Sequence, residues 1–162
     1  HVHHRYLEKA LPEAAGYLEN LTKKHKAQYA YLPELQNLFK TFSGIIAPRQ
    51  QQEEETIFPY IRQVARAYLN KESYAGLLVR TLRKPVEQVM LQEQKAIELV
   101  IRQMRELTNN YTPPPNACVS HKVTLLKLLE LDNDTVQHTH LENEMLYPRV
   151  LIMENELMSQ KD

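Results

Sequence analysis

Four segments of this chain carry apolar residues at alternating steps of three and four, and this spacing constrains the fold more than any other feature. Such a stripe is the pattern of a helix with one buried face. The segments cover residues 4–25, 35–60, 86–104 and 124–145, and no strand pattern interrupts them. The sequence therefore predicts an all-α fold. We expect an up-down antiparallel four-helix bundle that forms a single domain over residues 1–162.

Prolines and asparagines fall where these predicted helices should begin and end. Pro33 and Pro85 suit the first turns of the second and third helices, because a first turn needs no N–H donor. A less regular segment, residues 70–84, is expected between those two helices. Asn109, Asn110 and Pro113–Pro115 should end the third helix. Asn116 is the expected N-cap of the fourth helix, and Pro148 should limit or kink it.

Composition excludes several classes of protein. Lys plus Arg equals Asp plus Glu at 20 each, and no basic tract suggests nucleic acid or a membrane surface as a partner. No apolar run is long enough to cross a bilayer. Cys118 is the only cysteine, so an internal disulfide is impossible, and we expect a cytoplasmic protein. The chain opens on His1 without Met, so we expect a domain truncated at its N-terminus.

Each stripe becomes polar over a limited stretch. These positions are His4 on the first helix, Arg49 and Glu53 on the second, Gln94 on the third, and His138 and Glu142 on the fourth. In an up-down bundle all six fall at the same end. Burying six such groups without partners would be very costly. They are therefore expected to pair with one another, bind a metal or reach water.

The spacing of His138 and Glu142 places an imidazole and a carboxylate one turn apart on the same helix face. Bundle proteins build carboxylate-bridged metal sites from such pairs on facing helices. This spacing alone is common by chance. Together with inward-facing His4 and Glu53, it predicts a cluster with the donors of a metal site. The run from Gln50 to Glu55 is otherwise expected to be solvated, with only Glu53 turned inward.

Several longer motifs give the chain a family resemblance over nearly its whole length. They are HHRYL at residues 3–7, EEETIFP at 53–59, TNNYTPPPNAC at 108–118 and HTHLENEMLYPR at 138–149. On these motifs the chain resembles the hemerythrin-like domain of the di-iron repair-of-iron-centres proteins. The resemblance implies a cytoplasmic protein that helps repair iron–sulfur clusters damaged by oxidative or nitrosative stress. It implies iron as the cofactor and iron–sulfur proteins as partners.

The resemblance also assigns site residues and reveals two departures from the family pattern. It maps metal ligands onto His4, Glu53, His138 and Glu142. The family's second-helix and third-helix histidines correspond to Arg49 and Gln94. In related hemerythrins the histidines of the first two helices share one iron, and the last two helices supply the other. Each iron would therefore lose one imidazole here, and Pro48 should bend the helix beside Arg49.

These departures leave two interpretations of the site. In one, His4, Glu53, His138 and Glu142 hold a single divalent metal such as Fe, Zn or Mn. In the other, which we favour, no metal binds and Arg49 pairs with Glu53 and Glu142. Arginine stays protonated and cannot ligate a cation. A di-iron pair is not expected in either case. The matching functions are a repair protein with a degenerate site, a mononuclear metalloprotein, or a metal-free interaction or stress-sensing module.

Overall fold

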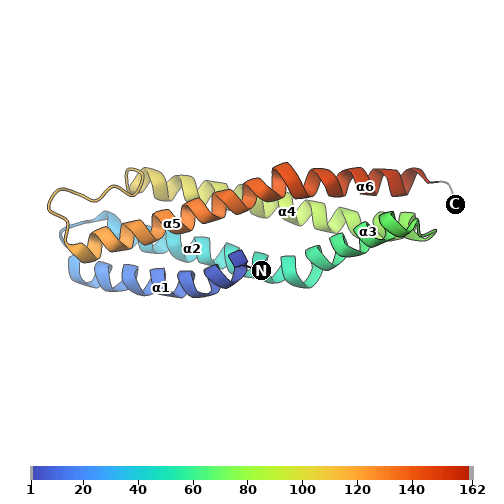
Figure 1. Cartoon of the computed structure of the whole chain (residues 1–162). Coiled ribbons are helices and arrows are strands. Elements are labelled where there is room, and N and C mark those ends of the chain that lie inside the picture. The colour runs from blue at the N-terminus through green and yellow to red at the C-terminus, as the bar shows by residue number, and fades with distance from the viewer. Residues whose placement is uncertain (1, 161–162) are drawn as a thin grey trace. The chain divides into compact units, whose positions relative to one another are not determined.

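The structure is a computed structural model that describes the backbone of residues 2–160 and the side chains of residues 4–82 and 91–160. In this part of the chain every regular element is helical, and no strand occurs. The chain runs through α1 (Val2–His25), α2 (Tyr31–Gln52), η1 (Glu53–Ile57), α3 (Phe58–Asn70) and α4 (Ala75–Leu107). It then continues through α5 (Val119–Leu141), η2 (Glu142–Leu146) and α6 (Tyr147–Ser159) (Figure 1). The all-α prediction is confirmed.

Two of the predicted helices contain a π-helical turn. The second stretch consists of α2, the π-helix η1 and α3, and the fourth consists of α5, the π-helix η2 and α6. Each π-turn closes with a backbone bond to the carbonyl five residues back, from Phe58 to Glu53 and from Tyr147 to Glu142. Six α-helices thus form four helical stretches in the described residues. Their arrangement as one up-down bundle, and as one domain over residues 1–162, stays a prediction.

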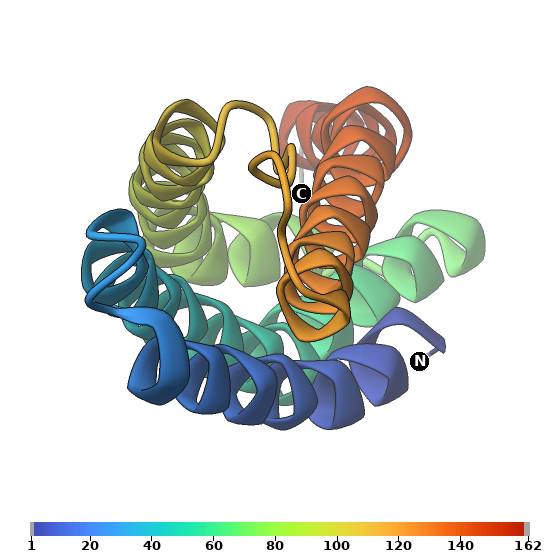
Figure 2. The ribbon, with the colours of Figure 1, turned by 90° about the vertical axis from the view of Figure 1, so that its left-hand side faces the viewer.

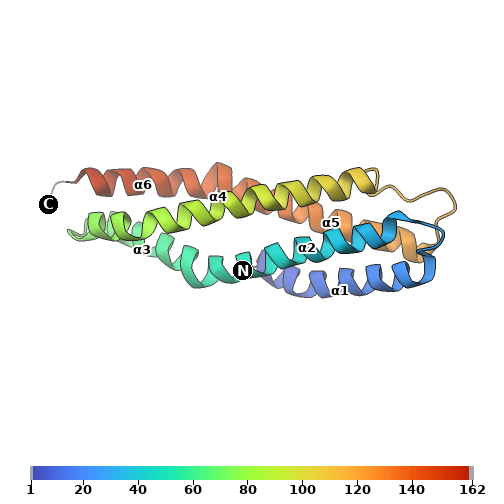
Figure 3. The same cartoon turned by 180° about the vertical axis from the view of Figure 1, so that it is seen from behind.

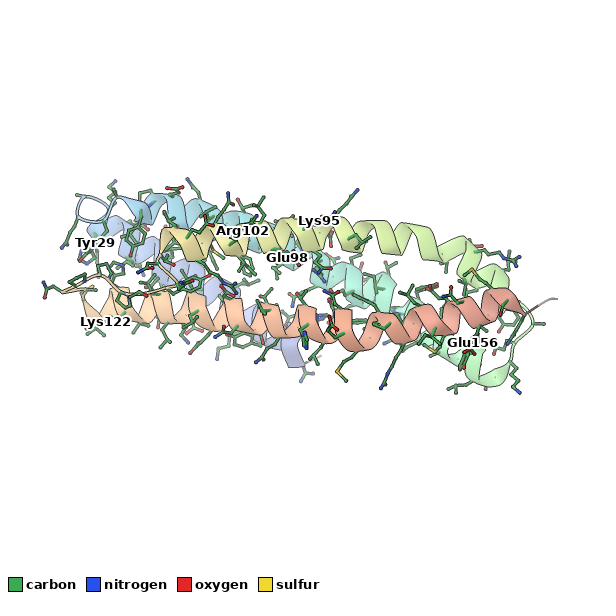
Figure 4. The ribbon with its side chains drawn as sticks, turned by 90° about the horizontal axis from the view of Figure 1, so that it is seen from above. Tyr29, Lys95, Glu98, Arg102, Lys122 and Glu156 are labelled. Carbon is green, nitrogen blue, oxygen red and sulfur yellow. The ribbon has the colours of Figure 1, made fainter. Side chains whose placement is uncertain are left out.

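The chain divides into two compact units. Unit 1 comprises residues 1–47 and 95–137, and unit 2 comprises residues 48–94 and 138–162. In unit 1, α1, α5 and the adjoining parts of α2 and α4 lie side by side (Figure 2). Their apolar stripes form one core, which includes Leu7, Leu18, Phe39, Phe42, Ile101 and Leu128. The opposite face of α4 is charged, with Lys95, Glu98 and Arg102 following one another along the helix (Figure 4).

Unit 2 has a smaller core built from α3, the first part of α4 and α6. A short turn reverses the chain between α3 and α4, and α6 packs against α3 (Figure 3). Tyr60, Val64, Ala67, Ala75, Val79 and Leu157 make up the core. Gly76 permits close packing, because a Cβ added there would lie 3.2 Å from the carbonyl oxygen of Leu157.

Three expectations about helix ends are wrong and two are confirmed. Pro33 lies in the first turn of α2, and α4 ends at Leu107, just before Asn109 and Asn110. However, α4 begins ten residues before Pro85, so most of residues 70–84 is helical. Asn116 is not the N-cap of α5, because it has a left-handed φ of 62° and the helix begins at Val119. The carbonyl of Cys118 accepts the first bond of that helix, from the N–H of Lys122.

Candidate metal centre

Four polar residues of unit 2 lie at the point where two helical stretches pass into their π-turns. Glu53 is the first residue of η1, and Glu142 is the first residue of η2. Arg49 and His138 each precede one of these glutamates by four residues, on α2 and α5. Both π-turns are followed within two residues by a proline, Pro59 and Pro148. A proline has no N–H for the carbonyl four residues earlier and clashes with it, and a wider turn relieves this conflict.

Arg49 connects the two glutamates. Its Nε donates to Glu53 Oε1 at 2.9 Å, and its Nη2 donates to Glu142 Oε2 at 2.6 Å. The side chain of Arg49 is only 7% exposed, and those of Glu53 and Glu142 are 2% and 3% exposed. Charge-assisted bonds of this length between buried groups are among the strong hydrogen bonds of proteins. The Arg49 pairing predicted from the sequence is therefore present in the structure.

His138 connects the same two glutamates through their other oxygens. Its Nε2 lies 2.7 Å from Glu142 Oε1 and 3.5 Å from Glu53 Oε2. Each carboxylate thus contacts Arg49 with one oxygen and His138 with the other. Two cationic groups and two carboxylates alternate around a closed ring, which we call the charge ring. With both cations protonated, the four charges cancel.

Electrostatics favours the charged forms of these groups. Burial raises the pKa of the Glu53 carboxyl, but the hydrogen bond from His138 and the charge of Arg49 outweigh it and lower the pKa to about 2. Burial lowers the pKa of His138, but its bonds to Glu142 and Glu53 prevail and raise the pKa to about 9. Arg49 behaves likewise, since Glu142 and Glu53 raise its pKa despite burial. Arg49, Glu53 and His138 therefore all favour their charged forms near neutral pH.

The six polar positions predicted from the sequence divide between the two units. His4 is buried and belongs to unit 1, whereas Arg49, Glu53, Gln94, His138 and Glu142 belong to unit 2. The gathering of His4 with the others therefore stays a prediction. Gln94 is half-buried on α4. Glu53 is the buried member of the run from Gln50 to Glu55, as expected, and His140 is exposed.

The sequence reasoning missed two ionisable neighbours of the charge ring. Burial, followed by the charges of Glu142 and Glu53, raises the pKa of the Tyr147 hydroxyl. Burial also raises the pKa of Glu93, where the charge of Arg49 acts in the opposite direction. A third buried carboxyl in unit 2, Glu154, accepts a hydrogen bond from Tyr60 at 2.7 Å. Tyr147 is the C-cap residue of the π-turn that Glu142 begins, and the helical spacing gave no signal of that turn.

Several known proteins are similar in sequence to most of this chain. The iron-sulfur cluster repair protein ScdA of Staphylococcus haemolyticus is 24% identical over 145 residues, which cover 90% of this chain and 61% of that protein. A probable iron-sulfur cluster repair protein of Haemophilus influenzae is 28% identical, with 92% and 60% covered. The iron-sulfur cluster repair protein YtfE of Escherichia coli O1:K1 is 27% identical, with 92% and 61% covered. The chain spans about three fifths of the length of these curated relatives.

The family model matches nearly the whole chain. It describes the hemerythrin HHE cation binding domain and covers residues 1–150. This range includes the charge ring, both π-turns and most of the described helices. No helix in the described residues has both the length and the apolar character needed to span a membrane. The chain belongs to the hemerythrin family of HHE cation binding domains.

Proposed function

We propose that this domain serves in the repair of iron–sulfur clusters and acts there without a di-iron centre of its own. The names of the relatives support the repair role. The observation that carries the second part is the position of Arg49, which bonds to both Glu53 and Glu142. In the family pattern these two glutamates bridge the metals. Here they bridge a guanidinium and an imidazole.

The residues present do not fit a pair of irons. Arg49 occupies one oxygen of each carboxylate and brings a permanent positive charge among the donors. Its guanidinium stays protonated and cannot ligate. Gln94, at the other lost histidine position, offers only a neutral amide, a poor match for iron beside imidazoles. The domain thus acts in repair as a binding module for damaged iron–sulfur proteins. A cytoplasmic location belongs to this proposal.

A second candidate is a mononuclear metalloprotein. It has support from His138 Nε2, which lies within 3.5 Å of an oxygen of each glutamate. Two carboxylates and an imidazole are a sound donor set for a divalent ion, and His4 would be its fourth member. The charge ring favours the metal-free state, because Arg49 and a protonated His138 already balance both carboxylates.

Metal analysis and a binding assay together test the proposal. The chain is produced with iron present and purified without oxygen, and its metal content is measured by elemental analysis. We expect far less than one metal ion per chain. We also expect binding to a [4Fe–4S] protein whose cluster was damaged by peroxide, and equal binding after chelator treatment. Two irons per chain with an oxo-bridged absorption band would contradict the metal-free part. Equal binding of this domain to the damaged and the intact [4Fe–4S] protein would contradict the repair role.

A further inference from the structure

The charge ring contains the donors of a metal site and a side chain that excludes the metal. We propose that Arg49 is the resident cation of this centre, and that replacing it with an uncharged residue turns Glu53, His138 and Glu142 into a site for one divalent ion. The inference rests on the proposed function only in taking the wild-type centre as metal-free. It adds that a single side chain determines that state.

The donor atoms already have spacings close to those of a metal site. Zinc and similar ions bind imidazole nitrogen and carboxylate oxygen at about 2.0–2.2 Å, so neighbouring ligands lie roughly 3 Å apart. His138 Nε2 lies 2.7 Å from Glu142 Oε1 and 3.5 Å from Glu53 Oε2. These distances bracket the required value. A shift of a few tenths of an ångström, within reach of a rotating carboxylate, would admit an ion.

Burial makes a cation necessary at this position. Glu53 and Glu142 are 2% and 3% exposed, and both direct an oxygen toward Arg49. Without Arg49, those oxygens lose their charged donor in a place where water has little access. Two buried carboxylates with weakened compensation strongly attract a cation. A divalent ion supplies two positive charges and can also take an imidazole, which a monovalent ion does poorly.

Arg49 also explains why the wild-type chain should bind metal weakly. An entering ion would approach a guanidinium that cannot lose its proton. It would also compete with bonds of 2.9 and 2.6 Å for the same carboxylates. The structure offers a matched control in unit 1. There Arg105 Nε donates to the buried Asp132 at 2.8 Å, but among the described side chains this site has one carboxylate and no histidine donor.

Zinc chloride alone, titrated by calorimetry into the full chain, tests the inference. Arg49→Met should bind one zinc ion per chain at least tenfold more tightly than the wild type. Arg105→Met should bind no more tightly than the wild type. Adding His138→Gln to Arg49→Met should lose most of the gain, since it removes the nitrogen donor.

A second variant covers the case in which Arg49→Met does not fold alone. Arg49→Gln keeps a polar side chain of similar reach and should show the same gain. If Arg49→Met is unfolded, recovery of its helical circular dichroism with one equivalent of zinc supports the inference. Zinc affinity equal to the wild type in both Arg49 variants, or zinc-independent unfolding of both, would overturn it. Stoichiometric metal in the wild type as purified would instead contradict the proposed metal-free function.

Discussion

Truncating Arg49 to Ala should destabilise this protein severely. The change removes both bonds that join Glu53 to Glu142 and leaves two buried carboxylates with His138 as the remaining cation of the charge ring. Removing one partner from a buried ion pair typically costs about 3–5 kcal/mol. For a domain of this size, that corresponds to a fall in Tm of roughly 6–20 °C. The free energy of unfolding at pH 7, from urea titrations followed by circular dichroism, measures it.

Arg105→Ala is the matched control for this prediction. Its side chain is 42% exposed, against 7% for Arg49, and its partner Asp132 keeps a second bond from Tyr111 at 2.7 Å. We expect a loss of about 1.5–2 kcal/mol, the lower part of the range for a hydrogen bond to a charged group, because solvent screens the partly exposed Arg105. A similar loss in both variants would mean that burial of the charge ring adds nothing to the effect.

The effect of Arg49→Ala should decrease as the pH falls. In the wild type, Glu53 stays ionised down to its pKa of about 2. In the variant the same carboxyl lacks its arginine, so burial favours protonation at a higher pH, and protonation removes the uncompensated charge. The reasoning is refuted if the variant unfolds within about 1 kcal/mol of the wild type at pH 7, a small effect for a buried charge. It is also refuted if chelator destabilises the wild type while the variant melts no lower, because a metal would then hold the site.

Three further predictions test the pH response, the lost ligands and the buried carboxyl of Glu154. The pKa of His138 is raised to about 9, so its contribution to stability is complete below pH 6.5 and is lost as the pH rises through 9. The pKa of Glu53 is lowered to about 2, so its contribution is complete above pH 4.5 and is lost as the pH falls through 2. His138→Gln should therefore abolish the decline in unfolding free energy between pH 6.5 and 9, up to about 3 kcal/mol. The double variant Arg49→His with Gln94→His should contain more iron than the wild type by elemental analysis. Pro48→Ala is added if the bent helix misplaces the new imidazole. An iron content equal to that of the wild type would mean that more than ligand loss separates this site from those of its relatives. Tyr60→Phe should cost about 1–3 kcal/mol in urea titrations, because Glu154 loses a buried donor, and an unchanged midpoint would contradict that role.

The helical stripes predicted the cores well where the helices are regular. Leu7, Leu18, Phe39, Phe42 and Leu128 all lie in the core of unit 1, as the three-and-four spacing required. The spacing also placed Arg49, Glu53 and Glu142 inward, and all three are buried. Polar residues in an apolar stripe were therefore as informative as the apolar residues themselves. Two other residues of the third stripe, Val86 and Met90, lie outside the described side chains.

The stripe prediction failed by one residue at two equivalent places. Continued from Glu53, the three-and-four spacing places Thr56 inward, but Thr56 is exposed and Ile57 is buried instead. Continued from Glu142, the same spacing places Met145 inward, but Met145 is 52% exposed, while its neighbour Leu146 is half-buried. Both errors lie inside a π-turn, which has an extra residue and shifts the inward face by one position. An uninterrupted α-helical period could not predict that shift.

Other errors came from relying on single residues. Pro85 suits the first turn of a helix, but α4 begins at Ala75, so the position of this proline did not mark the start of the helix. Asn116 is a favourable N-cap residue but adopts a left-handed conformation, as do Asn109, Asn110 and Tyr111 in the same connection. Asparagine tolerates that conformation better than most residues. The backbone N–H of Tyr111 donates to Thr108 Oγ1 at 2.9 Å, and its hydroxyl donates to Asp132 at 2.7 Å, a tertiary contact that no local pattern reveals.

The two π-turns show, from this chain alone, which residue of the charge ring is unusual. The segment from Arg49 to Pro59 and the segment from His138 to Pro148 share one pattern: a cationic residue, glutamate four positions later, an aromatic residue five after that, and then proline. Both glutamates begin a π-turn, so the two segments have the same local backbone and equivalent inward positions. Arg49 therefore stands where the other segment has His138. An imidazole can give up its proton to a metal, whereas a guanidinium cannot. We therefore expect metal binding by this domain to depend chiefly on the residue at position 49.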